Sequence, residues 1–251
     1  MTMRRIITLL TDFGTVDGYV GEMKGVLLSR APDIDVVDIT HDIPPQDVER
    51  GRLTLARVWR RFPSGTIHLV VVDPGVGASR AGLAVESDGR FLVGPDNGVL
   101  SPALLVPSAR AVELSLPPRA SATFHGRDVF APVAAAIARG EPLDALGRPS
   151  LGPIVRRTPE PVRCSDGSLD GEVILVDRFG NAVTNLFGSR GGAIEVGERR
   201  IAIRHTYSEV GIGEPVAVVG STGFIEIAVR DGSAAALLGL SRGFRVRLHS
   251  A

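Results

Sequence analysis

Two aspartates stand where buried strands are expected to end, and a glycine lies two residues after each. Asp12 follows an apolar run over 6–10, and Asp73 follows a β-branched run over 66–72. Ligands of parallel sheets bind outside the carboxyl ends of the strands, and glycine lets a ligand approach the backbone closely. A single Asp-Pro-Gly most often only forms a turn, but two such acids favour a site at this edge.

Arg80 and His125 are the other side chains that favour chemistry. Arg80 lies seven residues after Asp73, across a glycine-rich loop that can return its guanidinium group to the acid. His125 directly precedes a predicted helix over 126–140, whose dipole favours a neutral imidazole, although an isolated histidine there more often packs or caps. Asp12, Asp73 and His125 are ligand types that a hard metal accepts, but their spacing does not indicate one.

A second candidate group is Asp177-Arg178-Phe179-Gly180-Asn181. Phe179 and Asn181 place an aromatic ring and an amide two residues apart, which suits stacking on a heterocycle and hydrogen bonding to its edge. The same pattern is typical of a hairpin turn, and so is Gly220-Ser221-Thr222-Gly223. The sequence leaves both interpretations open.

The first 140 residues alternate strand and helix patterns. Strands are predicted over 6–10, 34–39 and 66–72, a hairpin over 84–93, and helices over 17–30, 47–61 and 126–140. Asp17 is the expected cap of the first helix, and the continuous apolar run over 66–72 is typical of a strand buried on both faces. This succession predicts a mostly parallel sheet covered by helices.

Four prolines between 149 and 161 predict a linker. Beyond it, short alternating runs separated by turns predict a small β-barrel or sandwich. These runs lie over 173–176, 194–203, 216–219, 225–229 and 244–248. We therefore expect an α/β protein with an N-terminal α/β domain over 1–148, a linker over 149–162 and a C-terminal small β-barrel domain over 163–251.

Composition excludes several classes of function. Lys and Arg together number 28, as do Asp and Glu, so the formal net charge is zero and no basic footprint for nucleic acid is present. Cys164 is the only cysteine, which excludes an internal disulfide and a cysteine-based metal site. No signal peptide, membrane span, phosphate-binding loop or dinucleotide motif is recognisable. We expect a cytoplasmic enzyme that uses no cofactor or metal and binds neither nucleic acid nor membrane.

Taken in order, these segments resemble one family, the S-adenosyl-L-methionine (SAM) hydroxide adenosyltransferases, or SAM hydrolases, which are related to fluorinase and chlorinase. The resemblance covers nearly the whole chain. It rests on LTDFG at 10–14, DITH at 38–41, VDPGVG at 72–77 with Arg80, GPDNG at 94–98, FHGRD at 124–128, DRFGN at 177–181 with TN at 184–185, and Ser221 with EIA at 226–228. No single motif is decisive, but their order across two domains is specific.

The resemblance implies displacement at C5′ of SAM by water or hydroxide, which releases adenosine and L-methionine. It implies no cofactor, and it implies a homotrimer with sites between subunits. The water-using members carry an Asp-Arg-His set that matches Asp73, Arg80 and His125, and the halide-using members lack it. In this interpretation Asp73 and Arg80 form an ion pair, while His125 positions the water and relays its proton.

The resemblance also implies substrate-binding residues in both domains. Asp12 matches the ligand of the ribose hydroxyls, Asp177 the acid that holds the methionine ammonium group, and Ser221 a residue near the methionine carboxylate. The remaining predicted contacts are Phe179 and Asn181, which match adenine contacts, together with Phe13, Glu226 and Ala228.

Two positions depart from the family pattern, and both bear on substrate affinity. Gln46 stands where the fluorinase has a tryptophan against the ribose, and Gly220 replaces an asparagine common in the family. Three alternatives stay open: a SAM-dependent halogenase, a metal-dependent hydrolase, and a non-catalytic protein that binds SAM or adenosine. Products formed in halide-rich buffer, the effect of a chelator, and turnover of SAM distinguish them.

Overall fold

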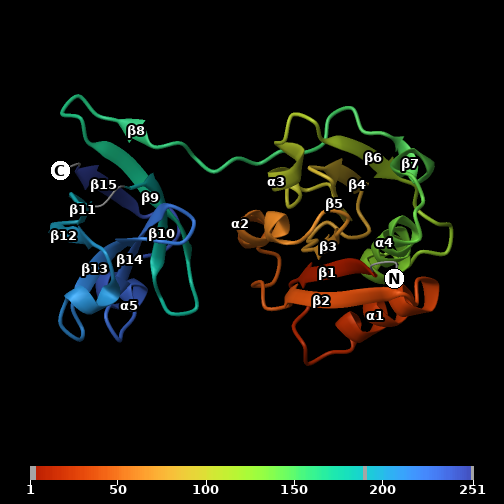
Figure 1. The fold of residues 1–251 in the computed structure, drawn as a ribbon, viewed down its shortest axis with the longest axis horizontal. Helices are drawn as coiled ribbons and strands as arrows, with labels where there is room; N and C mark the ends of the chain where they lie inside the picture. The colour runs from red at the N-terminus through yellow and green to blue at the C-terminus, as the bar shows by residue number, and fades with distance from the viewer. Residues whose placement is uncertain (1–3, 189–190, 250–251) are drawn as a thin grey trace. The chain divides into compact units, whose positions relative to one another are not determined.

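The computed structural model describes residues 4–188 and 191–249. The chain divides into two compact units, residues 1–157 and 158–251, coloured red to green and teal to blue in Figure 1. Within the described residues, no helix combines the length and the apolar character needed to cross a membrane.

In the described residues of the first unit, seven strands form one sheet with the order β2-β1-β3-β5-β4-β6-β7. The strands are β1 (Arg5–Thr11), β2 (Ile34–Thr40), β3 (Ile67–Val71), β4 (Gly82–Ser87), β5 (Arg90–Pro95), β6 (Arg110–Leu114) and β7 (Gly147–Pro149). β1, β2, β3 and β5 run parallel, whereas β4, β6 and β7 pair antiparallel. The predicted α/β fold is confirmed, with its parallel strands in one half of the sheet.

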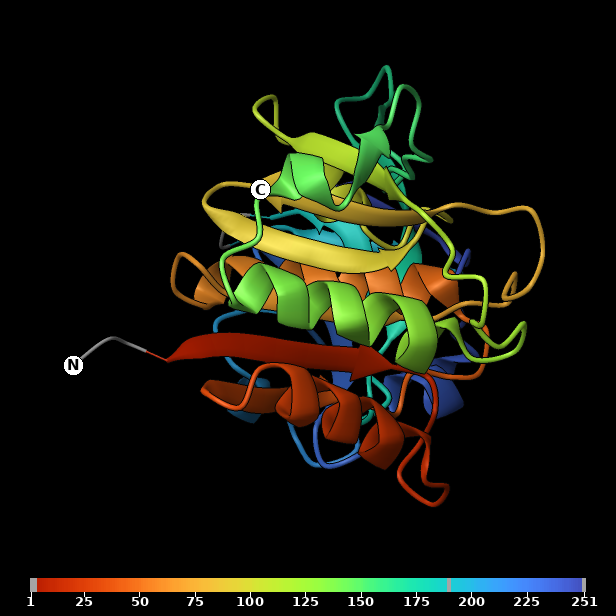
Figure 2. The ribbon, with the colours of Figure 1, turned by 90° about the vertical axis from the view of Figure 1, so that its right-hand side faces the viewer.

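Helices cover both faces of this sheet. They are α1 (Tyr19–Arg30), α2 (Val48–Val58), α3 (Ser101–Leu104) and α4 (Ala131–Ala138), with the short turns η1 (Trp59–Arg61), η2 (Gly126–Phe130) and η3 (Leu143–Ala145). Because side chains alternate along a strand, Leu9 packs in the apolar layer of α1 and α4, and Leu10 in the layer of α2 and α3. Figure 2 shows α1 and α4 side by side over one face.

The first two helices begin differently. Asp47 caps α2, because its Oδ1 accepts a hydrogen bond from the backbone N of Arg50 at 3.0 Å. Asp17 does not cap α1: the helix begins at Tyr19, and the cap position is Gly18, which makes no side-chain hydrogen bond. The predicted cap at Asp17 is wrong.

The predicted helix over 126–140 has two parts. Residues 126–130 form a π-helical turn, and the regular helix α4 follows. Pro132 lies in the first turn of α4, where its missing N–H leaves no hydrogen bond unmade. His125 therefore precedes a distorted turn rather than a regular helix.

The second unit is a β-barrel. Among residues 158–188 and 191–249, seven strands close in the order β10-β14-β13-β12-β11-β15-β9, with β9 pairing back to β10, and β8 adds to β9. The elements are β8 (Val162–Arg163), β9 (Leu169–Val176), β10 (Ala182–Phe187), β11 (Ala193–Val196), β12 (Arg199–Arg204), η4 (Tyr207–Glu209), β13 (Pro215–Val219), β14 (Phe224–Val229), α5 (Ala234–Leu238) and β15 (Arg245–His249). The predicted small β-barrel is confirmed.

One predicted run in this unit is wrong. The pattern over 194–203 contains two strands, β11 and β12, joined by a tight turn at Gly197, whose φ is +58°. Ile194 lies opposite Ile201 across the hairpin. The apolar positions are even-numbered before the turn, at 194 and 196, and odd-numbered after it, at 201 and 203, and this change of phase marks the break.

Candidate active site

The side chains of Asp73, Arg80 and His125 lie in direct contact. Arg80 donates from Nε to Asp73 Oδ1 at 2.9 Å and from Nη2 to Asp73 Oδ2. The same Nη2 lies 2.8 Å from His125 Nδ1. The side chains of Asp73 and Arg80 are only 5% and 10% exposed. The structure thus brings His125 to a pair of residues that lies forty-five positions earlier in the chain.

Two loops carry these residues, and they touch. The loop from Asp73 to Arg80 follows β3, and a Cβ at Gly77 would lie 2.4 Å from the backbone oxygen of Ala122. Gly77 also has a φ of +78°, so this close approach requires glycine. The guanidinium carbon of Arg80 lies 5.3 Å from the centre of the Phe130 ring, which supports it from the π-helical turn.

Hydrogen-bond chemistry fixes the protonation of His125. Arginine only donates, so His125 Nδ1 accepts from Arg80, and the neutral ring carries its proton on Nε2. Burial, and then the positive charge of Arg80, lower the pKa of His125 below 6.5. The predicted neutral histidine therefore has a different cause from the expected helix dipole.

Asp12 follows β1 and is held by the segment after β2. Its Oδ2 accepts a hydrogen bond from the backbone N of Gln46 at 2.7 Å. Gln46 has a φ of +67°, which is uncommon for a residue other than glycine and costs local strain. Burial raises the pKa of Asp12, and the negative charge of Asp73 raises it further. The acids at these two strand ends therefore share one electrostatic environment.

A second histidine, which the sequence analysis gave no role, fixes the turn at Asp12. The Thr11 hydroxyl lies 2.8 Å from His41 Nδ1 and accepts from the backbone N of Phe13 at 3.3 Å. The backbone N of Gly14 donates to the His41 carbonyl at 2.9 Å. These contacts join residues some thirty positions apart, so only the resemblance singled out this segment.

Phe13 belongs to a cluster of three aromatic rings. Its ring centre lies 5.8 Å from that of Phe124 and 5.9 Å from that of Tyr19, and the Tyr19 and Phe124 rings meet edge to face at 5.3 Å. The cluster ties the turn at Asp12 to the segment before His125. A contact of Phe13 with substrate stays a prediction.

In the second unit, Asp177 organises its own loop. Its Oδ1 accepts from the backbone N of Phe179 and of Asn181, both at 2.9 Å, and its Oδ2 accepts from Asn181 Nδ2 at 3.1 Å. This is a hairpin turn between β9 and β10, one of the two interpretations that the sequence left open. The Phe179 side chain is 76% exposed, and its contact with adenine stays a prediction.

Glu226 and Ala228 are buried on β14, which pairs with β10 beside this loop. A Cβ at Gly220 would lie 2.0 Å from Glu226 Oε1, so the glycine at this departure from the family makes room for the carboxylate. Ser221 lies exposed in the turn before β14. The barrel thus groups the predicted contacts of this unit around β14 and the turn after β9.

Tyr207 is a member of this group that the sequence analysis missed. Its hydroxyl donates to Glu226 Oε2 at 3.4 Å. Burial raises the pKa of Tyr207, and the negative charges of Glu226 and Asp177 raise it further. The phenol therefore stays protonated and able to donate. Being one of two tyrosines in the chain was its only signal.

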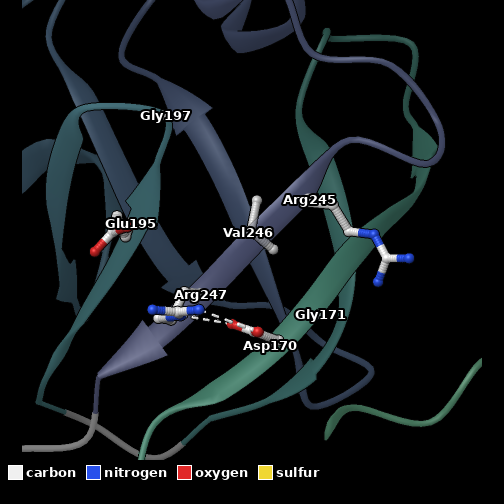
Figure 3. A pocket seen from close by; sticks show the side chains of 7 residues that line it. All are labelled: Asp170, Gly171, Glu195, Gly197, Arg245, Val246 and Arg247. Atoms are coloured by element: carbon white, nitrogen blue, oxygen red, sulfur yellow. Dashed lines mark hydrogen bonds and ion pairs between the residues drawn. The ribbon is translucent and has the colours of Figure 1, made fainter. Parts of the chain in front are cut away.

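A separate surface pocket of the second unit lies over β9, β11 and β15 (Figure 3). Arg247 donates to both carboxylate oxygens of Asp170, at 2.5 and 3.1 Å, and Glu195 and Arg245 line the remaining walls. Opposite charges balance within this pocket. It contains none of the residues that the sequence assigns to the substrate.

The acids and the histidine of the first unit do not form an evident metal site. Across residues 4–188 and 191–249, no group of three or more His, Cys, Asp or Glu side chains is arranged to hold a metal ion. Asp73 and His125 instead surround the guanidinium group of Arg80, whose positive charge disfavours a nearby cation.

Known proteins resemble both units. The family models described as SAM hydroxide adenosyltransferase N-terminal domain and C-terminal domain match residues 7–147 and 171–247. An (R)-S-adenosyl-L-methionine hydrolase from Thermus thermophilus is 45% identical over 97% of this chain and 99% of its own length. A fluorinase from Actinopolyspora mzabensis is 29% identical over 98% and 97%. The crystal structure of an uncharacterized conserved protein from Thermotoga maritima has a TM-score of 0.87 and 34% identity, covering 96% of this chain and 99% of that one. Since the domain models match in order and the hydrolase aligns almost end to end, this chain belongs to the SAM hydroxide adenosyltransferase family.

Proposed function

We propose that this protein hydrolyses the R form of S-adenosyl-L-methionine to adenosine and L-methionine, by attack of water or hydroxide at C5′. The observation that carries the proposal is the mutual contact of Asp73, Arg80 and His125, which suits binding and polarising one water molecule. The hydrolase relative supports the proposal, since its name states this substrate and it is closer to the chain than the fluorinase.

A carboxylate alone does not generate hydroxide. Free aspartic acid has a pKa near 3.9 and bulk water one of about 15.7, a gap of about 12 units, or roughly 16 kcal/mol. The proton must therefore leave as the C–O bond forms, while the site stabilises a hydroxide-like oxygen. Arg80 supplies the positive charge that does so, in surroundings from which water is largely excluded.

Asp73 and His125 then have different tasks. Each carboxylate oxygen of Asp73 keeps a second acceptor position beyond its bond to Arg80, so Asp73 is the proposed acceptor of the water proton. His125 carries its proton on Nε2 and donates it as a hydrogen bond to the water oxygen. Its basic nitrogen faces Arg80, so positioning the water suits this geometry better than relaying the proton.

The chemistry of the substrate reduces what the protein has to supply for the leaving group and for the charge of the transition state. A sulfonium leaves as a neutral thioether, so no acid is needed. Attack by a hydroxide-like oxygen on the carbon next to a cationic sulfur neutralises charge in the transition state, which a site of low dielectric constant favours. Asp73 offsets the repulsion between Arg80 and this cation, because a bidentate ion pair carries no net charge.

Substrate binding is proposed for residues of both units. Asp12 and Phe13 hold the ribose and its surroundings, while the adenine and methionine ends bind to Asp177, Phe179, Asn181, Ser221, Glu226 and Ala228. Three of about four acceptor positions on the Asp177 carboxylate serve its own loop, which leaves one for the ammonium group. We further propose a homotrimer with sites between subunits, which the family resemblance supports.

The assembly is tested by mixing two inactive variants. Asp73→Ala and Asp177→Ala chains are each expected to be inactive alone. If each site combines residues from two chains, refolding them together restores activity at about a quarter of the sites. No recovery in a mixture that is trimeric by mass photometry would contradict shared sites.

The reaction is tested with SAM in oxygen-18 water. Label in the 5′-hydroxyl of adenosine, detected by mass spectrometry, is expected from direct displacement by water. Separate assays of the two sulfonium epimers test the preference for the R form. SAM that remains intact would contradict the enzyme assignment and favour a binding protein, and 5′-halo-adenosine formed in halide-rich buffer would favour a halogenase.

A further inference from the structure

One turn holds both ends of the loop over 73–80, which carries the ion pair. The side-chain amide of Asn97 donates from Nδ2 to the carbonyl of Val72 at 2.8 Å. The backbone N of Asp96 donates to the carbonyl of Ala81 at 2.9 Å. Val72 directly precedes Asp73 and Ala81 directly follows Arg80, so both bonds lie one residue from the reacting side chains.

The rest of this loop depends on its ends. Its backbone hydrogen bonds are local turns, from Val76 N to the Asp73 carbonyl at 3.2 Å and from Ala78 N to the Gly75 carbonyl at 3.1 Å. Residues 77–79 are exposed. Local turns set the shape of a loop but not its orientation, so the bonds at its two ends, together with the approach of Gly77 to Ala122, decide where the Asp73 carboxylate lies.

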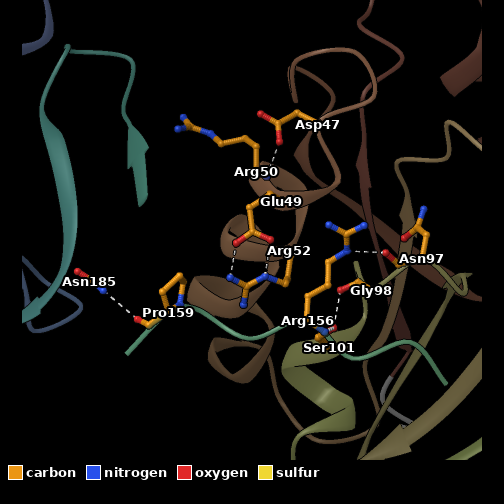
Figure 4. Close-up of polar contacts among 10 residues, drawn as sticks. All are labelled: Asp47, Glu49, Arg50, Arg52, Asn97, Gly98, Ser101, Arg156, Pro159 and Asn185. Atoms are coloured by element: carbon orange, nitrogen blue, oxygen red, sulfur yellow. Dashed lines mark hydrogen bonds and ion pairs between the residues drawn. The ribbon is translucent and has the colours of Figure 1, made fainter. Parts of the chain in front are cut away.

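The turn that holds the loop is itself fixed from outside (Figure 4). The Asn97 carbonyl accepts from Arg156 Nε at 2.9 Å. Asn97 Oδ1 accepts from the backbone N of Val99 at 3.1 Å. The backbone N of Ile154 donates to Asp96 Oδ1 at 2.8 Å. A Cβ at Gly98 would lie 2.5 Å from Arg156 Cγ, so the arginine packs directly on the backbone of the turn.

We propose that Asn97 is a positioning residue for the hydrolysis, acting through the carbonyl of Val72 on the orientation of Asp73. The inference rests on the proposed function. Asn97 uses its acceptor to form the turn and its donor to hold the loop. A substitution can therefore test the two roles separately, because a variant can keep the acceptor that forms the turn and lose the donor that holds the loop.

Asn97→Ser is the first test. A serine oxygen can still accept the backbone N–H two residues on, but its side chain is too short to reach Val72. We expect kcat to fall about 10- to 100-fold, since a misplaced reacting group costs about that much, while KM for SAM stays within about threefold. Ser87→Ala is the matched control, because it removes a buried hydrogen bond to Ala103 O in the same unit. It should leave kcat unchanged.

Asn97→Asp gives a second test, a pH dependence of kcat that a general loss of stability would not produce. The ionised carboxylate keeps the acceptor but sets an oxygen against the Val72 carbonyl, whereas the protonated carboxyl group donates to it again. The ratio of its kcat to that of the wild type is therefore expected to rise as pH falls. The same ratio for Asn97→Ser should stay flat over the pH range in which circular dichroism shows all three proteins folded.

The outcomes separate the inference from the proposed function. Adenosine release by the wild type, with kcat of Asn97→Ser within about threefold of it, overturns the inference alone. Equal losses in Asn97→Ser and Ser87→Ala, or a flat ratio for Asn97→Asp, also overturn it. A wild type that leaves SAM intact overturns the proposed function, and the positioning role with it.

Discussion

His125 can accept the hydrogen bond of Arg80 only while its Nδ1 carries no proton. Because burial and Arg80 lower its pKa below 6.5, we expect kcat to be constant near neutral pH and to fall on the acid side with an inflection below 6.5. His125→Asn keeps an acceptor near Nδ1 but does not titrate, so its slower reaction should lose this inflection. An inflection above 6.5, unchanged in the variant, would argue against this assignment.

Arg80 joins Asp73 and His125 through the geometry of its guanidinium group. Arg80→Lys keeps the charge but loses the fork, and kcat is expected to fall by about 100-fold or more. Arg247→Lys is the control, since Arg247 binds both oxygens of Asp170 through the same two nitrogens, Nε and Nη2, but neither residue is assigned to the substrate. Near-normal turnover of Arg80→Lys in a steady-state assay would count against the geometry.

Local sequence patterns could predict the contact of Asp73 with Arg80, but not the contacts between residues that lie far apart in the chain. Asp73 and Arg80 share a short glycine loop, so their contact follows from local reasoning. Tyr207 reaches Glu226 from nineteen residues away, and Asn97 reaches Val72 from twenty-five. Such contacts depend on strand order, which leaves no mark in a local pattern.

At the scale of elements, the site depends on the approach of the loop at Gly77 to the segment at Ala122. Gly77→Ala is expected to lower both stability and kcat, because its Cβ would collide with a backbone oxygen that cannot move alone. Gly140→Ala is the control: its φ of +95° is also positive, but no atom lies within 4 Å of the added Cβ.

The strain of a positive φ costs each of these variants about 1 kcal/mol of unfolding free energy. Only Gly77→Ala should also reduce kcat, as measured with SAM on protein shown to be folded. Equal kcat values for the two variants would mean that the two loops need not touch.

The sequence predicts the type of an element correctly where one structural environment accounts for its whole pattern. The apolar run of β3 predicts a central strand because both of its faces are buried. The π-helical turn at 126–130 could not be predicted, since its local sequence pattern does not distinguish it from the regular helix that follows. The predicted linker over 149–162 stays a prediction, although hydrogen bonds of Ile154 and Arg156 attach part of it to the first unit.

At the scale of the whole molecule, one buried histidine makes folding sensitive to pH. His68 lies in the centre of the sheet, with Nδ1 2.7 Å from the Thr8 hydroxyl, and burial lowers its pKa to about 4. Between pH 6.5 and 4, His68 is protonated in the unfolded chain but stays neutral in the folded protein. Protonation of His68 in the unfolded chain should therefore make the unfolding free energy about 3 kcal/mol lower at pH 4 than at pH 6.5.

Urea unfolding at several pH values measures this loss. His68→Asn keeps a partner for Thr8 without titrating, so its unfolding free energy should vary less over the same range. Proton NMR of the folded wild type provides a check that needs no variant. A His68 ring that titrates near 6.5 would contradict the expected pKa.

The absent side chain at Gly220 has a consequence for how related chains can diverge. Any residue with a Cβ at this position would overlap the Glu226 carboxylate as it lies here. The asparagine that relatives carry at the matching position thus cannot coexist with this placement of the glutamate. A relative with asparagine there needs another rotamer of its glutamate, so the glycine sets where this carboxylate lies rather than whether a glutamate is present.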